Sequence, residues 1–172
     1  SAQPFNETLV LFSDHSQFVI DTKGNLTPAT ISITATTEFE NKSSVQPVPA
    51  GPRLYFIAER GDFSALYEYF VDTDAITKDA SEVSGHVPRF IPKNVKKMAA
   101  SSNEDILFAL SSEHNNRLYV YKWYWSAGSS VADRASKVQS SWSYWEFDSG
   151  DTILDISVLA NYVYIVVSRS DG

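Results

Sequence analysis

A short alternating pattern occurs twice in this chain and constrains its fold more than any other feature. Residues 66–70 read LYEYF, and residues 118–122 read LYVYK. Each copy follows an apolar run, at 55–59 and 106–110, and a short polar turn, which is the sequence pattern of a β-hairpin. A third apolar run, at 162–167, leads into a polar turn without a returning strand. The pattern predicts repeated β units, the last of them cut within the repeat.

Strand signals continue along most of the chain. They are short, alternating and rich in β-branched and aromatic residues, and no long stretch has a helical period. One short helical turn is expected at residues 79–84, because Gly85 and Pro88 follow a polar stretch. The sequence therefore predicts an all-β fold. The expected strands are residues 8–12, 17–21, 29–39, 54–58, 65–71, 106–110, 117–125, 142–147, 153–159 and 162–167.

The spacing of the repeats indicates how the sheets are organised. Apolar runs recur about 45 to 58 residues apart, which is near the length of a propeller blade. A closed propeller has about four to eight blades, and this chain has strands for about three. We therefore expect antiparallel sheets arranged as an incomplete β-propeller. Residues 1–172 are predicted to form a single β domain that is a fragment of a larger protein.

Alternation assigns the aromatic side chains to faces. The aromatic residues with odd numbers in 119–125 point to one side of their strand, and the residues between them point to the other side. Glu68 in the earlier copy and Lys122 in the later copy each interrupt one face, so that face is expected to meet solvent or a polar neighbour. We expect the rings to fill the space between sheets. A sugar-stacking platform is the alternative.

Composition excludes several classes of function. With 14 basic and 21 acidic side chains the net charge is −7, which disfavours tight wrapping of nucleic acid. The chain has no cysteine, so it lacks thiolate nucleophiles, disulfides and cysteine-based zinc sites. No apolar stretch approaches the roughly 20 residues that span a bilayer, and no membrane partner is expected.

Candidate catalytic and metal sites are weak. Residues 13–15 (SDH) hold three triad residue types, but a working triad needs them to converge from separate elements. The three histidines lack metal spacing, and residues 72–74 begin like a calcium loop that is not completed. We expect no catalytic, metal or cofactor-binding residue. Carboxylates that could hydrolyse glycosides in pairs, with nothing to select a pair, are Asp62, Glu68, Asp72 and Glu146.

Several segments carry a resemblance. Residues 84–92 (SGHVPRFIP) are similar to a Ser-His-Val-Pro-aromatic-Ile-Pro segment, here with Gly85 inserted, and residues 141–147 (SWSYWEF) to a Gln-Ser-Trp-Ser-x-Trp-x-Phe strand, although Gln139 lies one residue too early. Nearer the start are residues 4–5 (PF), 9–12 (LVLF), 13–14 (SD), 17–19 (QFV) and 24–27 (GNLT). In this order, over nearly the whole chain, they resemble the central region of the tail nozzle protein, or tail tubular protein B, of short-tailed autographivirus-type phages.

The resemblance implies a structural role in the virion tail and no enzymatic activity. Nozzle proteins of this type form a hexamer below the tail adaptor, contain propeller-like β domains and surround the channel through which DNA leaves the capsid. The implied partners are other nozzle copies, the tail adaptor protein, tail fibres and DNA that passes without sequence-specific binding. The loops at residues 61–62 and 126–137 are expected to contact neighbouring subunits or fibres.

Two other functions stay open at this point. One is a carbohydrate-binding or polysaccharide-degrading module of a phage tail, which the four Trp and nine Tyr residues would suit. It would require an exposed aromatic strip beside two carboxylates. The other is a propeller-type interaction domain of cellular origin, which would be expected to have a complete set of blades.

The segment from His86 to Pro92 is the predicted structural anchor of the chain. Pro88 and Pro92 fix the backbone angle φ at two points, and Phe90 can pin the crossing to a sheet. Replacing Phe90 by Ala should cost about 3 to 5 kcal/mol if the ring is buried. The full set of predicted anchor residues is His86, Pro88, Phe90, Pro92, Trp142 and Trp145.

Overall fold

The structure, a computed structural model, describes residues 1–21, 27, 30–72, 77–126 and 137–170. These residues contain β-strands and no helix, in agreement with the predicted all-β class. None of them therefore forms an apolar helix of the length that crossing a membrane requires. The strands are β1 (Ala2–Phe5), β2 (Thr8–Phe12), β3 (Gln17–Asp21), β4 (Ile33–Thr37), β5 (Val48–Ala50), β6 (Arg53–Glu59), β7 (Ser64–Asp72), β8 (Thr77–Glu82), β9 (Val95–Ser101), β10 (Ile106–Ser111), β11 (Arg117–Trp125), β12 (Lys137–Glu146), β13 (Thr152–Leu159) and β14 (Tyr162–Ser168).

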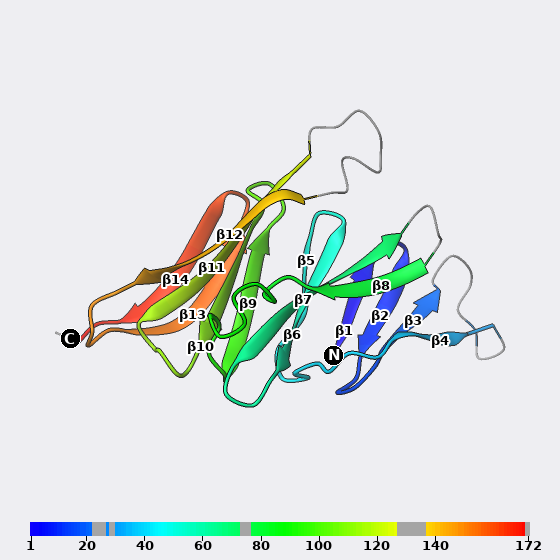
Figure 1. Cartoon of the computed structure of the whole chain (residues 1–172), viewed down its shortest axis with the longest axis horizontal. Helices are drawn as coiled ribbons and strands as arrows, with labels where there is room; N and C mark the ends of the chain where they lie inside the picture. Colours follow the sequence, from blue (N-terminus) through cyan, green and yellow to red (C-terminus); the bar gives the residue numbers. More distant parts are fainter. Residues whose placement is uncertain (22–26, 28–29, 73–76, 127–136, 171–172) are drawn as a thin grey trace.

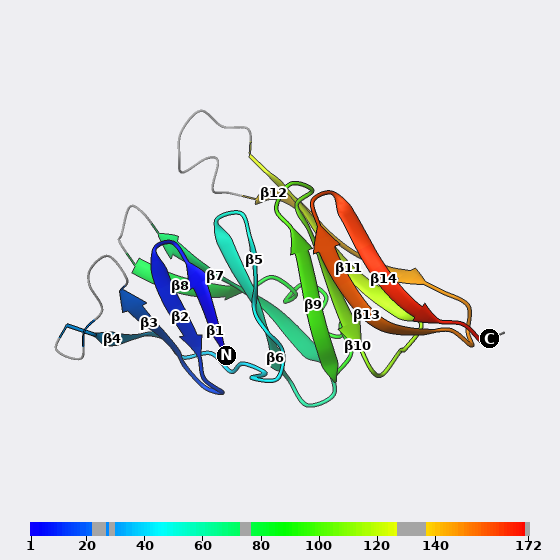
Figure 2. The ribbon, with the colours of Figure 1, turned by 180° about the vertical axis from the view of Figure 1, so that it is seen from behind.

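The strands form four antiparallel sheets in which chain neighbours pair with each other. The first sheet is β1–β4, the second is β5–β8, the third is β9–β12, and the last is the hairpin β13–β14. Figure 1 shows the sheets following one another in chain order, with the first sheet at one end of the molecule and the hairpin at the other. Figure 2 shows the same order from behind.

The predicted hairpins are confirmed. Strand β6 pairs with β7 with Ile57 opposite Leu66, and β10 pairs with β11 with Leu110 opposite Leu118. The turn between β6 and β7 contains Gly61 with a φ of 71°, a left-handed backbone conformation that glycine adopts without steric cost. The apolar runs that set the repeat interval lie in β2, β6, β10 and β14, the second strand of each sheet.

The structure corrects the helical turn predicted at residues 79–84. Residues 77–82 form β8, an outer strand of the second sheet that pairs with β7 and places Asp79 opposite Phe70. The stretch reads as polar because charged side chains are common on edge strands, where they discourage pairing with other molecules. Pairing with β7 gives its backbone a partner that local sequence does not reveal.

Other boundaries also differ from the prediction. Of the strand expected at 29–39, residue 29 lies outside the described residues, and residues 33–37 form β4. The strand expected from residue 142 begins at Lys137. Strands β1, β5 and β9 are additional. Pro4 and Pro49 weaken the strand signal of β1 and β5, and the two lysines of β9 weaken its signal. These three are first strands at a sheet edge, where such residues are tolerated.

An apolar core fills each space between consecutive sheets, and the predicted face assignment is confirmed. Tyr67 and Tyr69 of β7 pack in the core shared with the first sheet, whereas Leu66 points into the core shared with the third sheet. In β11, Tyr119, Tyr121 and Trp123 pack toward the second sheet. The alternate residues of β11, Leu118 and Val120, pack against the final hairpin. Strands β7 and β11, the third strands of their sheets, thus both direct their aromatic face at the preceding sheet.

Ring contacts link the sheets through these cores. Between the first and second sheets, the ring centroids of Phe12 and Phe56 are 5.2 Å apart. Between the second and third sheets, the centroids of Tyr55 and Trp123 are 5.1 Å apart. Aromatic rings at such separations contribute stabilisation beyond the area that they bury. The rings therefore fill inter-sheet space, as alternation predicts.

Two leucine substitutions test this division between core and surface. Leu107 of β10 is fully buried in the core between the second and third sheets, whereas Leu159 of β13 is 67% exposed. Leu107→Ala should lower the free energy of unfolding by about 2 to 5 kcal/mol, and Leu159→Ala should change it by less than about 0.5 kcal/mol. Thermal unfolding of the 172-residue chain measures both. Equal losses of stability would contradict the core assignment.

Candidate functional site

The predicted anchor segment connects the second and third sheets. The backbone N–H of Ser64 donates to the carbonyl of Ile91 at 3.0 Å, and Phe63 forms a bridge with Pro92. Ile91 is buried in the core between the two sheets, with the partly buried Phe90 packed against that core. Residues 90–92 are thus held by sheet contacts at this crossing.

The structure brings some of the predicted anchor residues together and separates others. Phe90 lies 5.9 Å from Trp142, measured between ring centroids. His86 and Pro88 are exposed. Trp145 lies on the other face of β12, 5.1 Å from the Phe108 ring, and is 42% exposed. An anchoring role for the six residues stays a prediction, and Phe90 with Trp142 has the contacts that it requires.

A charged pair lies between the second and third sheets. Glu68 of β7, which was predicted to face solvent or a polar neighbour, forms an ion pair with Lys137, the first residue of β12. Only 12% of the Glu68 side chain and 14% of the Lys137 side chain are exposed. The Lys137 Nζ also donates to the Tyr121 hydroxyl at 3.3 Å, and the Ser81 hydroxyl donates to Glu68 at 3.4 Å. Removing one partner would leave an uncompensated charge in this interior.

Aromatic rings surround the Lys137 ammonium group. Its Nζ lies 5.0 Å from the ring centroid of Tyr55, 5.2 Å from those of Tyr121 and Trp123, and 5.5 Å from that of Trp125. Each distance is within the range of a cation–π interaction. We call these four residues, together with Glu68, the aromatic cage.

Burial changes the acidity of the groups in the cage. It raises the pKa of Tyr121 to about 12, because the phenolate would lose its water, and the nearby charge of Glu68 adds to the effect. Burial also raises the pKa of Tyr55, again with a contribution from Glu68. It lowers the pKa of Lys137, although the charge of Glu68 opposes the shift. Both tyrosines are thus uncharged at neutral pH, and the Tyr121 hydroxyl accepts a hydrogen bond from Lys137.

Sequence reasoning missed Lys137 because it placed this residue in a loop. Of that expected loop, residues 127–136 lie outside the described residues, and Lys137 belongs to a strand. The available signal was Glu68. It lies between two tyrosines in the sequence, on the strand face that also carries Leu66 and Phe70. A carboxylate in that position requires a cationic partner when it is buried.

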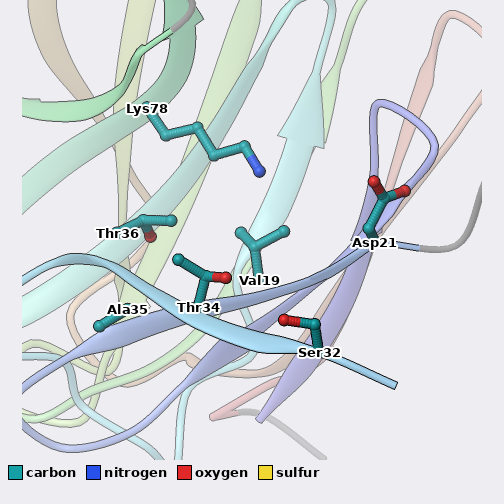
Figure 3. A pocket seen from close by; sticks show the side chains of 7 residues that line it. All are labelled: Val19, Asp21, Ser32, Thr34, Ala35, Thr36 and Lys78. Carbon is teal, nitrogen blue, oxygen red and sulfur yellow. The ribbon is translucent and has the colours of Figure 1, made fainter. Parts of the chain in front are cut away.

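Two surface hollows bear on the carbohydrate-binding alternative, which requires an exposed aromatic strip beside two carboxylates. One, of about 540 Å³, lies over β3 and β4, with Asp21 and Lys78 among its lining residues and without an aromatic ring (Figure 3). The other, of about 160 Å³, lies between the third sheet and the hairpin and is lined by Trp145, Tyr162 and one carboxylate, that of Glu104. Neither places an aromatic strip beside two carboxylates.

The other candidate chemical groups are dispersed or paired. Residues 13–15 lie in the turn between β2 and β3, where the Ser13 N–H donates to the Ser16 carbonyl at 2.9 Å. Glu146 pairs with Arg117 at 2.7 Å. Within the described part of the chain, no three histidine or acidic side chains are grouped as a metal site would require. The incomplete calcium loop extends into residues 73–76, which lie outside the described residues.

The hairpin β13–β14 presents an exposed apolar face. Tyr162, Tyr164 and Val166 alternate along β14 and are each more than half exposed. Leu159 lies opposite Tyr162 and extends the same face. The opposite face of the hairpin, with Ile153 and Ile156, packs on the third sheet. We call Leu159, Tyr162, Tyr164 and Val166 the outer hairpin face.

Replacement of Phe90 tests the crossing between the second and third sheets. Because its ring is partly buried, Phe90→Ala should cost about 1 to 3 kcal/mol of unfolding free energy, less than the roughly 3 to 5 kcal/mol of a fully buried ring. Arg89→Ala, at the exposed neighbouring position, is the matched control and should be neutral. Chemical denaturation measures both variants. A Phe90→Ala protein as stable as the control would refute the anchoring role.

Comparison with known proteins identifies the family of this chain. The family model described as bacteriophage nozzle protein matches residues 1–172. The tail tubular protein gp12 of Escherichia phage T7 is 28% identical over 167 residues, which cover 96% of this chain and 20% of the relative. The chain thus spans about a fifth of the length of that curated relative. Both matches are structural parts of the virion tail rather than enzymes, and the chain belongs to the bacteriophage nozzle protein family.

Proposed function

We propose that this chain is a section of the wall of a phage tail nozzle and contributes to the conduit through which DNA is ejected. The observation that carries the proposal is the match of the nozzle family over all 172 residues. The fold suits a mechanical role. Sheets joined by continuous apolar cores resist deformation, because close-packed interiors have low compressibility.

The repeated orientation of the sheets supports a propeller-like arrangement. Strands β7 and β11 both direct their aromatic face at the preceding sheet, so each unit is stacked on its predecessor in the same way. The three complete sheets each have four strands, the number in a propeller blade. We propose that residues 1–172 form a single β domain, a fragment of a longer nozzle protein, with these sheets as consecutive blades.

The outer hairpin face provides a surface for assembly. Its tyrosines alternate along a strand as the tyrosines that pack between the other sheets do. The chain matches only 20% of the length of its T7 relative. We propose that its occupant is a further sheet of the same nozzle protein, stacked in the same manner. An apolar face of this kind is stabilised by being covered. Contacts with other nozzle copies in a hexamer, with the tail adaptor and with tail fibres would then involve other surfaces.

The charge of the chain suits a conduit for DNA. A net charge of −7 repels the phosphate backbone, whereas binding would require clustered cationic side chains. Two lysines of β9 have local partners: Lys97 pairs with Asp155 at 2.6 Å, and Lys96 donates to the Ile153 carbonyl at 3.4 Å. We propose that DNA passes the wall transiently and without sequence-specific binding.

Single-particle electron microscopy of the intact parent protein tests this function. The parent protein should be imaged alone and mixed with its tail adaptor, because nozzle subunits could require that template. The expected result is a six-fold ring with an open axial channel whose wall contains this segment. Monomers under both conditions would contradict the nozzle proposal and would favour the glycan-binding alternative. The candidate glycan site would then be the hollow lined by Trp145, Tyr162 and Glu104.

A further inference from the structure

We propose that the aromatic cage is a binding site for an alkylammonium group and that Lys137 is its resident ligand. The cage is assembled from both sheets: Tyr55 and Glu68 come from the second sheet, and Tyr121, Trp123 and Trp125 come from the third. Lys137 enters it from the first position of β12. Occupation of the cage therefore fixes the start of β12 on the second sheet.

The surroundings of the ammonium group match the chemistry of a cation site. Aromatic faces carry negative electrostatic potential and attract a cation at the observed ring distances of 5.0 to 5.5 Å. The Glu68 carboxylate supplies the opposite charge, and the Tyr121 hydroxyl accepts a hydrogen bond at 3.3 Å. Aromatic cages are the arrangement that proteins use to recognise quaternary ammonium ligands.

A shift in strand register places a lysine rather than an apolar side chain in the cage. Strand β12 pairs with β11 with Gln139 opposite Tyr124, and the next pair is Lys137 opposite Trp125. Val138 is passed over by this irregularity and is 67% exposed. In regular register Val138 would stand opposite Trp125, on the cage side. The bulge therefore turns a lysine inward and a valine outward, the reverse of ordinary hydrophobic patterning.

Chemical rescue tests the proposal with the 172-residue chain. Lys137→Ala removes the atoms of one n-propylammonium ion beyond Cβ and leaves Glu68 without its partner. The melting temperature should fall by about 6 to 20 °C. Added n-propylammonium chloride should raise it again in proportion to the logarithm of its concentration, with a saturable change in tryptophan fluorescence from Trp123 and Trp125.

Controls separate ammonium binding from general effects of solvent and salt. Sodium chloride at equal ionic strength and neutral n-propanol should not restore stability. The Lys122→Ala variant, which loses an exposed lysine on the same sheet, should not respond to n-propylammonium. A Glu68→Gln, Lys137→Ala double variant should lose most of the rescue, because the opposing charge is gone.

Two outcomes of the melting experiments would overturn the proposal. One is a response of Lys137→Ala to n-propylammonium no larger than that of Lys122→Ala, and the other is equal rescue by n-propanol, which would make the cage an ordinary apolar cavity. If Lys137→Ala does not fold alone, the variant is refolded with n-propylammonium. Return of the native near-ultraviolet circular dichroism only with the ammonium ion supports the site, and its failure to return refutes it.

Discussion

The packing of the aromatic face of β11 on the second sheet is the contact on which the rest of the structure depends. It joins the two central sheets through Tyr119, Tyr121 and Trp123 on one side and Tyr55 and Ile57 on the other. Ile91, in the connection between these sheets, is buried in the same core. Aromatic side chains bury large areas at a low cost in conformational entropy, which suits an interface between separate sheets.

This interface also explains why a charged pair is tolerated in the interior. Glu68 and Lys137 lose most of their hydration, but each gains an opposite charge, and Lys137 gains four aromatic faces. Buried pairs of this kind add less to stability than apolar packing of equal volume but penalise misplacement of either partner. The pair thus favours one position of β12 on the second sheet. A defined position for each sheet is what the proposed role as a section of a nozzle wall requires.

How much of the fold could be predicted from the sequence depended on how clearly apolar and polar residues alternate in each strand. Hairpins and strand faces follow from alternation within a few residues. Glu68 was expected to meet solvent or a polar neighbour, and the structure shows the polar neighbour, Lys137. Strands β5 and β9 pair with the next strands of the chain, β6 and β10, but the proline of β5 and the lysines of β9 weaken the alternation that marks a strand. The mistaken helical turn at 79–84 has the same cause, because β8 is a polar strand without clear alternation, although it pairs with β7.

The candidate site was predicted less completely than the fold. The Phe90 contact with Trp142 joins two segments that resemblance had singled out separately. The position of Lys137 results from the irregular register of β12, which no alternation pattern reveals. A bulge inserts one extra residue into one strand, so the side chains beyond it change faces relative to the partner strand. The sequence could thus indicate that Glu68 needs a cation but not which one.

The core between the second and third sheets should make them one cooperative unit. Native-state hydrogen exchange of the 172-residue chain, read by mass spectrometry, tests it most directly, because exchange reports the free energy of each opening. We predict that the amides of β6, β7, β10 and β11 share the highest protection and lose it together when Leu107 is replaced by Ala. Protection of β6 and β7 that is unchanged while β10 and β11 open would contradict the claim.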